Sequence, residues 1–209
     1  MRWATFDCYG TLIDWNGGIR GELARVFGEE RADELLRRYH ELEPQLEADG
    51  TRSYREVLTE AMRELGAPAG EEDALARSLP TWRPFPEVPA ALHRARKRGW
   101  KLAILSNTDR DFIDASQEQI GVPFELAIVA SEIGSYKPAL GHWQAFERDA
   151  GRLPDVHVAA SLFHAIAPAN ELGLRSIWIN RLHEQPGPEP TRELLDLTQL
   201  PDALEEVAA

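Results

Sequence analysis

The sequence predicts an α/β protein in which a parallel sheet alternates with helices and is interrupted once by a helical insert. Apolar runs of strand length recur along the chain, and amphipathic stretches of helical length separate them. This alternation is typical of a parallel sheet covered by helices. Residues 16–81 differ, because they show helical periodicity and contain no strand-like run. We expect them to form a separate helical unit beside the sheet.

Each expected strand is an apolar run that ends in polar residues. In a parallel sheet the carboxyl ends of the strands lie at one edge, and ligands bind there. The polar residues that follow the strands therefore carry the functional information. The runs occupy residues 2–7, 101–106, 126–130, 156–161 and 175–180, and helices are expected over residues 88–98, 110–119, 139–150 and 166–172.

The helical insert ends at a proline-rich exit between residues 80 and 89. We therefore expect two domains, an α/β core of residues 1–15 and 82–209 and a helical cap of residues 16–81. The chain after residue 185 is expected to be a loop, followed by a terminal helix over residues 201–207. Four acidic residues of the cap are expected to form a solvated face: Glu41, Glu43, Glu47 and Asp49.

Composition narrows the class of partner. The 209 residues carry a formal net charge of −12, whereas a nucleic-acid partner usually requires a basic surface. Cys8 is the single cysteine, so no internal disulfide can form and a reducing compartment is expected. No apolar run reaches the roughly 18 residues of a membrane span. We expect a cytoplasmic protein with neither a nucleic-acid nor a membrane partner.

Four polar motifs fall where the architecture predicts a site. Asp7 follows the first strand and precedes a glycine turn, whose free backbone N–H groups can keep a nucleophilic carboxylate ionised. Taken alone, such an aspartate is more often a loop cap. The other motifs are the sequence SNTD at residues 106–109, Lys137 before a proline, and the strand–helix junction AASLFHAIAPA at residues 159–169.

In their order and spacing, these motifs resemble the haloacid dehalogenase superfamily over nearly the whole chain. The ending at residues 178–181 resembles the 2-haloacid dehalogenase branch in particular. The resemblance implies a Rossmann-like core with a small helical cap inserted after the first strand. It also implies that Asp7 attacks the carbon that bears the halogen, that an ester of Asp7 forms, and that water then hydrolyses this ester.

The same resemblance implies roles for further residues. Lys137 and Ser106 match catalytic residues of the family, and the expected substrate is a short 2-substituted carboxylic acid. Five residues match positions that contact the substrate or the halide: Tyr9, Thr11, Arg38, Asn107 and Trp143.

Two departures keep other functions open. Phosphatases of the superfamily have an acid at the position of Tyr9 and Mg²⁺-binding acids where this chain has Ala160 and Ala165. We therefore expect no metal and no cofactor. The same alanines remove groups that would position the hydrolytic water, which leaves His164 as the candidate base. A phosphatase and a catalytically silent binding protein remain alternatives. The amphipathic cap helices are compatible with a homodimer.

Overall fold

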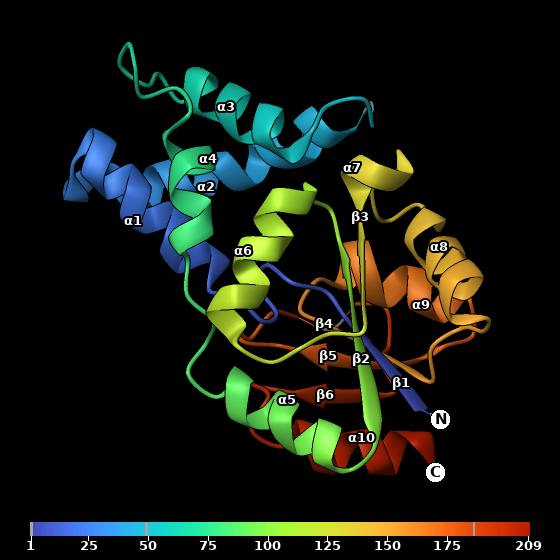
Figure 1. The fold of residues 1–209 in the computed structure, drawn as a ribbon. Helices are drawn as coiled ribbons and strands as arrows, with labels where there is room; N and C mark the ends of the chain where they lie inside the picture. The colour runs from blue at the N-terminus through green and yellow to red at the C-terminus, as the bar shows by residue number, and fades with distance from the viewer. Residues whose placement is uncertain (1, 49, 186) are drawn as a thin grey trace.

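The computed structural model describes residues 2–48, 50–185 and 187–209. Its centre is a parallel sheet of six strands in the order β3-β2-β1-β4-β5-β6 (Figure 1), so the predicted α/β fold class is confirmed. The central strand β1 pairs with β2 on one side and β4 on the other. The strands are β1 (Arg2–Phe6), β2 (Trp100–Ser106), β3 (Leu126–Val129), β4 (Val156–Ala159), β5 (Arg175–Ile179) and β6 (Arg192–Leu194).

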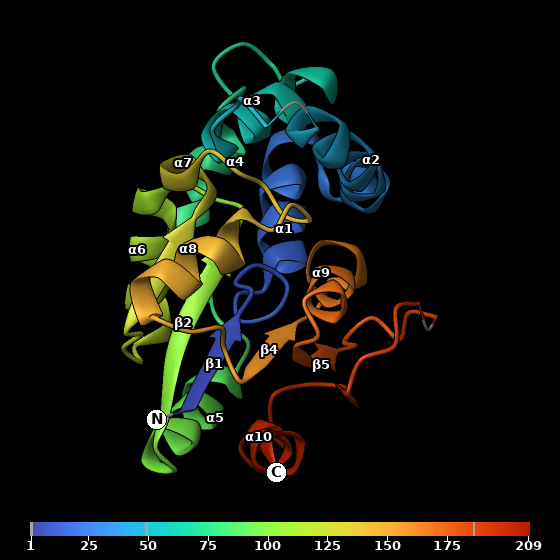
Figure 2. The same ribbon diagram turned by 90° about the vertical axis from the view of Figure 1, so that its right-hand side faces the viewer.

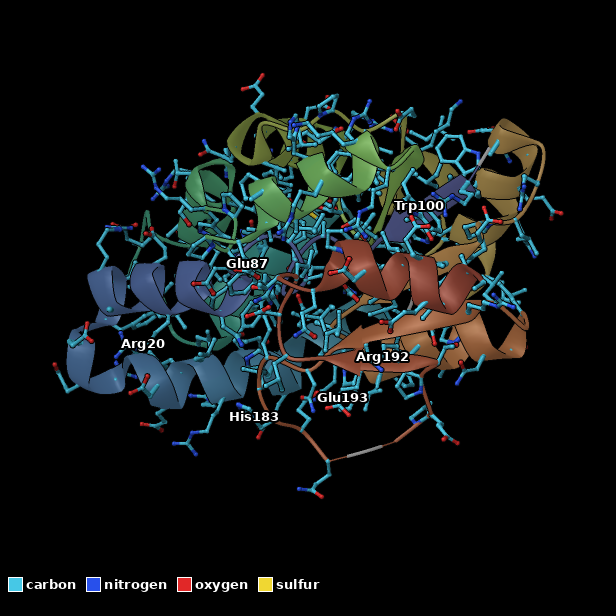
Figure 3. All side chains as sticks on the ribbon, turned by 90° about the horizontal axis from the view of Figure 1, so that it is seen from below. Arg20, Glu87, Trp100, His183, Arg192 and Glu193 are labelled. Atoms are coloured by element: carbon cyan, nitrogen blue, oxygen red, sulfur yellow. The ribbon has the colours of Figure 1, made fainter. Side chains whose placement is uncertain are left out.

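Helices cover both faces of the sheet, because alternate strand side chains point to opposite faces. Phe6 points into a core shared with α5 (Val88–Lys97), α6 (Arg110–Ile120) and α10 (Leu200–Ala208). Figure 3 shows α5 and α10 side by side from below. On the other face Trp3 packs edge-to-face on Phe146 of α8 (Gly141–Ala150), and α9 (Ala167–Glu171) lies against β5.

The described residues of the insert form four helices and a short 3-10 turn, Leu79–Thr81. The helices are α1 (Trp15–Phe27), α2 (Glu29–Glu47), α3 (Tyr54–Glu64) and α4 (Ala74–Ser78). The described residues of 16–81 contain no strand. Figure 2 shows α1, α2 and α3 on the side toward which the arrowheads of β1 and β4 point. The insert therefore faces the carboxyl edge of the sheet, while the exact domain boundaries stay a prediction.

Buried side chains hold the insert together. Leu35 and Tyr39 of α2 join Leu58 and Met62 of α3 in the main core. Ser53 begins α3 with a capping box, because its hydroxyl accepts from the backbone N–H of Glu56 and the Glu56 carboxylate accepts from that of Ser53. In the described part of the chain no helix has both the length and the apolar character that a membrane crossing requires.

The chain after residue 185 corrects one prediction, because it contains β6 as well as the expected terminal helix. Arg192 and Glu193 of this edge strand are exposed, and Figure 3 labels both. The strand has three residues, too few for an alternating pattern to show in the sequence. It exists because β5 offers its free edge for pairing. Two further short elements are α7 (Ala130–Ile133) and a π-helical turn, Leu162–Ile166.

Candidate active site

Asp7 follows the last residue of β1 and meets a lysine from a distant part of the chain. Lys137 Nζ donates to Asp7 Oδ1 at 2.7 Å, and Thr11 Oγ1 donates to Asp7 Oδ2 at 3.1 Å. The backbone N–H of Asp7 donates to the carbonyl of Val158 on β4 at 3.0 Å. Both carboxylate oxygens thus have a donor that stabilises the anion.

Lys137 is held rigidly in this position. Its side chain is 2% exposed, and its ammonium also donates to the carbonyl of Leu105 at 2.7 Å. The Asn107 side chain forms two hydrogen bonds with the Lys137 backbone: Oδ1 accepts from the Lys137 N–H at 2.7 Å, and Nδ2 donates to the Lys137 carbonyl at 3.0 Å. The lysine therefore neutralises Asp7 without needing to reorder during a reaction.

Thr11 and Ser106 connect the motifs. The Thr11 hydroxyl, which donates to Asp7, accepts from the backbone N–H of Ala160 at 2.9 Å. Ser106 ends β2 with 1% of its surface exposed, and its carbonyl is 3.0 Å from His142 Nε2. A glycine is needed between Asp7 and Thr11 because the backbone at Gly10 has a φ of 81°. The turn thereby returns Thr11 to the carboxylate that it orients.

A cavity of about 650 Å³ opens above Asp7, between the carboxyl edge of the sheet and helices α2 and α3. The sheet side contributes the predicted residues Tyr9, Ser106, Asn107 and His164 together with the Asp7–Lys137 pair. The volume suits a small organic substrate. The insert contributes His40, Glu43, Pro44, Glu47 and Tyr54, and Trp15 at the start of α1 also lines the cavity.

Three predicted residues do not line this cavity. Thr11 is fully buried and contacts Asp7 through its hydroxyl. Arg38 is exposed and donates to the carbonyl of Glu64 at 3.4 Å. Helix α2 turns His40 toward the cavity, and a residue two positions away on a helix points to the opposite face. Trp143 is fully buried in the core between α8 and the sheet, with its ring 5.2 Å from that of His157. Local sequence similarity locates a residue in a helix but does not determine which face is buried.

The sequence reasoning also missed Arg181, which lines the cavity just after β5. Its Nη2 donates to the Thr11 carbonyl at 3.0 Å and to Glu87 at 2.6 Å, and its guanidinium lies 3.6 Å from the centre of the Phe85 ring. Its position just after the β5 strand could have identified it from the sequence, because polar residues at strand ends lie at the carboxyl edge of the sheet. With Lys137, it brings positive charge to a cavity that is otherwise lined by several acids.

Glu43 and Glu47 overturn the expectation of a solvated acidic face. Both line the cavity, whereas Glu41 is exposed as expected; Asp49 lies outside the described residues. Their spacing of four places them on one side of α2. Glu43 Oε1 accepts from the hydroxyls of Tyr39 at 2.9 Å and Tyr54 at 2.7 Å.

Burial changes the protonation of this pair. Desolvation raises the pKa of Glu43 to about 7 even though the two tyrosine hydroxyls stabilise its anion. Desolvation and the neighbouring Glu43 raise the pKa of Glu47 to about 9, while the Asn107 amide, 3.4 Å from Glu47 Oε2, partly offsets this. At neutral pH the Glu47 carboxyl therefore keeps its proton.

Tyr9 and His164 both lie where predicted. The Tyr9 hydroxyl is 3.0 Å from Ser116 Oγ, its ring stacks on Tyr54, and burial raises the pKa of Tyr9 well above its usual value. His164 Nδ1 is 3.2 Å from Ser161 Oγ, and burial together with the nearby Lys137 charge lowers the pKa of His164. The imidazole is therefore neutral at pH 7 and can accept a proton.

The residues at this edge do not fit Mg²⁺, which superfamily phosphatases bind here. Mg²⁺ prefers octahedral oxygen ligation that includes carboxylates. The fourth motif has alanines, Ala160 and Ala165, at the positions of the metal-binding acids, and one oxygen of Asp7 is taken by an ammonium group. Within residues 2–48, 50–185 and 187–209, no three His, Cys, Asp or Glu side chains gather in a metal-binding cluster.

These observations define a class: an α/β protein with a helical insert after β1 and an aspartate–lysine pair at the carboxyl edge of its sheet. The chain belongs to the haloacid dehalogenase-like hydrolase family, whose pattern matches residues 1–159. It is therefore a hydrolase, as the resemblance in the sequence had implied.

Known dehalogenases are similar to this chain over most of its length. The chain is 29% identical to an (S)-2-haloacid dehalogenase of Pseudomonas sp. (strain YL), over 97% of this chain and 94% of that one. It is 27% identical to haloacetate dehalogenase H-2 of Moraxella sp. (strain B), over 84% of each. The L-2-haloacid dehalogenase of Xanthobacter autotrophicus with chloropropionic acid covalently bound shares the fold, with a TM-score of 0.84, 19% identity and 98% coverage of both chains.

Proposed function

We propose that the chain hydrolyses short 2-haloacids, with Asp7 as the nucleophile and no metal. The observation that carries this proposal is the 2.7 Å contact between Asp7 and the buried Lys137 at the floor of the cavity. The names of the two relatives support the choice of substrate, because both are dehalogenases of haloacids.

The reaction begins with attack by an Asp7 oxygen on the carbon that bears the halogen. The new C–O bond forms as the C–X bond breaks, and the halide leaves with the electron pair. Lys137 offsets the repulsion between the Asp7 carboxylate and an anionic substrate. We assign the substrate carboxylate to the buried Ser106 hydroxyl, the halide to the side where Asn107 lies, and shaping of the wall to Tyr9. Thr11 orients the nucleophile.

The second half-reaction hydrolyses the ester. Water attacks the carboxyl carbon of Asp7, the ester C–O bond breaks, and a 2-hydroxy acid leaves. A group that accepts a proton from this water is required, because Ala160 and Ala165 cannot. We assign this role to His164, which is neutral and lines the cavity.

The proposal also covers the domain boundaries, the cellular compartment and the oligomeric state. The core comprises residues 1–15 and 82–209, and the cap comprises residues 16–81. The buried free thiol of Cys8 suits the reducing cytoplasm. A homodimer is proposed from the amphipathic insert helices, and sedimentation analysis tests it directly.

Halide release from chloroacetate and 2-chloropropionate tests the proposal, with intact mass spectrometry after brief exposure to substrate. The wild type should release halide and carry the carboxyalkyl group of the substrate transiently on Asp7, as an ester. Asp7→Asn should do neither, whereas Asp202→Asn, a change of an exposed aspartate in α10, should do both. If no haloacid yields halide between pH 7 and 10, the proposal fails. Magnesium-dependent hydrolysis of p-nitrophenyl phosphate would then favour a phosphatase, and inertness in both assays would favour a silent binding protein.

A further inference from the structure

We propose that Glu47 donates a proton to the departing halide, so that the helical insert supplies the leaving-group acid that the core lacks. This inference rests on the proposed dehalogenation. It names a further catalytic residue and a substrate subclass, haloacids with a basic leaving group such as fluoride.

Contacts place Glu47 on the leaving-group side of the cavity. Its Oε2 lies 3.4 Å from the amide Nδ2 of Asn107. That amide is the group assigned to the halide, and it also holds the backbone of Lys137, whose ammonium contacts Asp7. Hydrogen bonds therefore connect Glu47 to Asp7 through Asn107 and Lys137. The Glu47 side chain remains partly open to the cavity.

The surroundings keep a proton on Glu47 and not on its neighbour. Glu43 has two tyrosine hydroxyls that stabilise its anion, whereas among the described residues the one hydrogen bond to the Glu47 carboxyl is the long contact from Asn107. The charges of Glu43 and Asp7 both disfavour a second anion, and Lys137 acts in the opposite direction more weakly than burial does. Two nearby carboxyls that cannot both ionise share one proton, and here it resides on Glu47.

The alternatives for this role are occupied or distant. Arg38, which the family resemblance assigned to the halide, lies outside the cavity. The Tyr9 hydroxyl stands at the position of the phosphatase acid but is engaged with Ser116. Fluoride is the most basic halide and the poorest leaving group, so its departure gains most from a proton donor.

The proton balance closes over one turnover. In fluoride release, as Asp7 forms its bond to carbon and the C–F bond breaks, the Glu47 proton passes to the leaving fluoride, which departs as HF. His164 then takes one proton from the water that attacks the ester. The other water proton ends on the product oxygen when the ester C–O bond breaks. His164 returns its proton to Glu47 through water in the cavity, and the net reaction is RX + H₂O → ROH + HX.

A leaving-group series tests the inference. Rates of halide release from bromoacetate, chloroacetate and fluoroacetate are compared for the wild type, Glu47→Gln and Glu41→Gln. The glutamine at position 47 keeps the shape but cannot transfer a proton. A general acid contributes about 10²- to 10⁴-fold, so Glu47→Gln should lose at least about 100-fold on fluoroacetate and far less on bromoacetate. The exposed Glu41→Gln should match the wild type on all three substrates.

Each outcome decides a different point. If Glu47→Gln loses the same factor on all three substrates, Glu47 is structural and the inference fails while the proposed dehalogenation stands. If the wild type releases no halide from any of them, the proposed function fails and the inference with it.

A measurement on the wild type covers the case in which Glu47→Gln does not fold. Fluoride release should fall as pH rises through the elevated pKa of Glu47, because the acid form is lost. Bromide release should lack this alkaline decline. Identical pH profiles for the two halides would overturn the inference.

Discussion

Replacing Lys137 by methionine should destabilise the protein as well as inactivate it. The change removes the ammonium but keeps an unbranched side chain of similar length. It deletes two hydrogen bonds of 2.7 Å, to Asp7 Oδ1 and to the Leu105 carbonyl. Asp7 then keeps Thr11 as its side-chain donor, and its carboxylate is left with little compensation in a site where its side chain is 14% exposed.

The magnitude follows from the geometry. At 2.7 Å and an effective dielectric constant of about 20, the charge pair is worth about 6 kcal/mol. Desolvation of the ammonium offsets part of this in the wild type, and breaking a buried pair typically costs about 3–5 kcal/mol. Because Asp7 retains some contact with the cavity, we expect about 3 kcal/mol. At about 2 kcal/mol per molar urea, the unfolding midpoint should fall by about 1.5 M.

Urea unfolding at pH 7.5 measures this effect, and halide release measures the loss of activity. The matched control is Lys97→Met, which removes an exposed lysine at the end of α5. Its midpoint should stay near that of the wild type, since exposed charges contribute little. If the two variants unfold at the same urea concentration, the Lys137–Asp7 pair does not stabilise the fold and this reasoning is refuted.

Three further predictions concern other parts of the molecule. Arg38→Ala should leave chloroacetate turnover unchanged, because Arg38 is exposed and outside the cavity; a large loss would show that α2 presents another face to the substrate. Burial lowers the pKa of His142 and of His157 to about 3, so at these two sites the unfolded chain binds more protons below pH 6.5, and each histidine should cost about 2 kcal/mol from pH 7.5 to 5; because the raised pKa values of Glu43 and Glu47 act in the opposite direction, the cost is measured as the difference between the wild type and His157→Asn, and an equal change of urea midpoint in both proteins over this range would contradict it. Gly18→Ala should destabilise by about 1–3 kcal/mol, because its new methyl group would overlap the buried Trp82 ring; unfolding at an unchanged or higher urea concentration would show that the ring can move.

The sequence was most informative where chemistry follows a strand. Asp7, Ser106 and the segment before His164 each come directly after an apolar run, and parallel pairing alone brings such ends together. Lys137 was identified from its motif, and the structure brings its ammonium to Asp7. These assignments depend on the backbone and on short-range order, which a sequence pattern expresses directly.

The insert shows the limit of that reasoning. Periodicity predicted its helices, yet it did not establish whether Arg38 or Glu47 faces the nucleophile, because that depends on how α2 rotates against α1 and α3 when apolar residues such as Leu35 are buried. Trp143 was misplaced for the same reason, since α8 buries it against the sheet.

By itself, then, the sequence determined the α/β class and the position of Asp7 at the carboxyl edge of the sheet, because local pattern and strand order suffice for both. Only the tertiary structure decided which charges enclose the substrate. It removed an arginine from the cavity and placed Arg181, Glu43 and Glu47 there. A side chain's charge state depends on its burial and on neighbours distant in sequence, and packing alone supplies both.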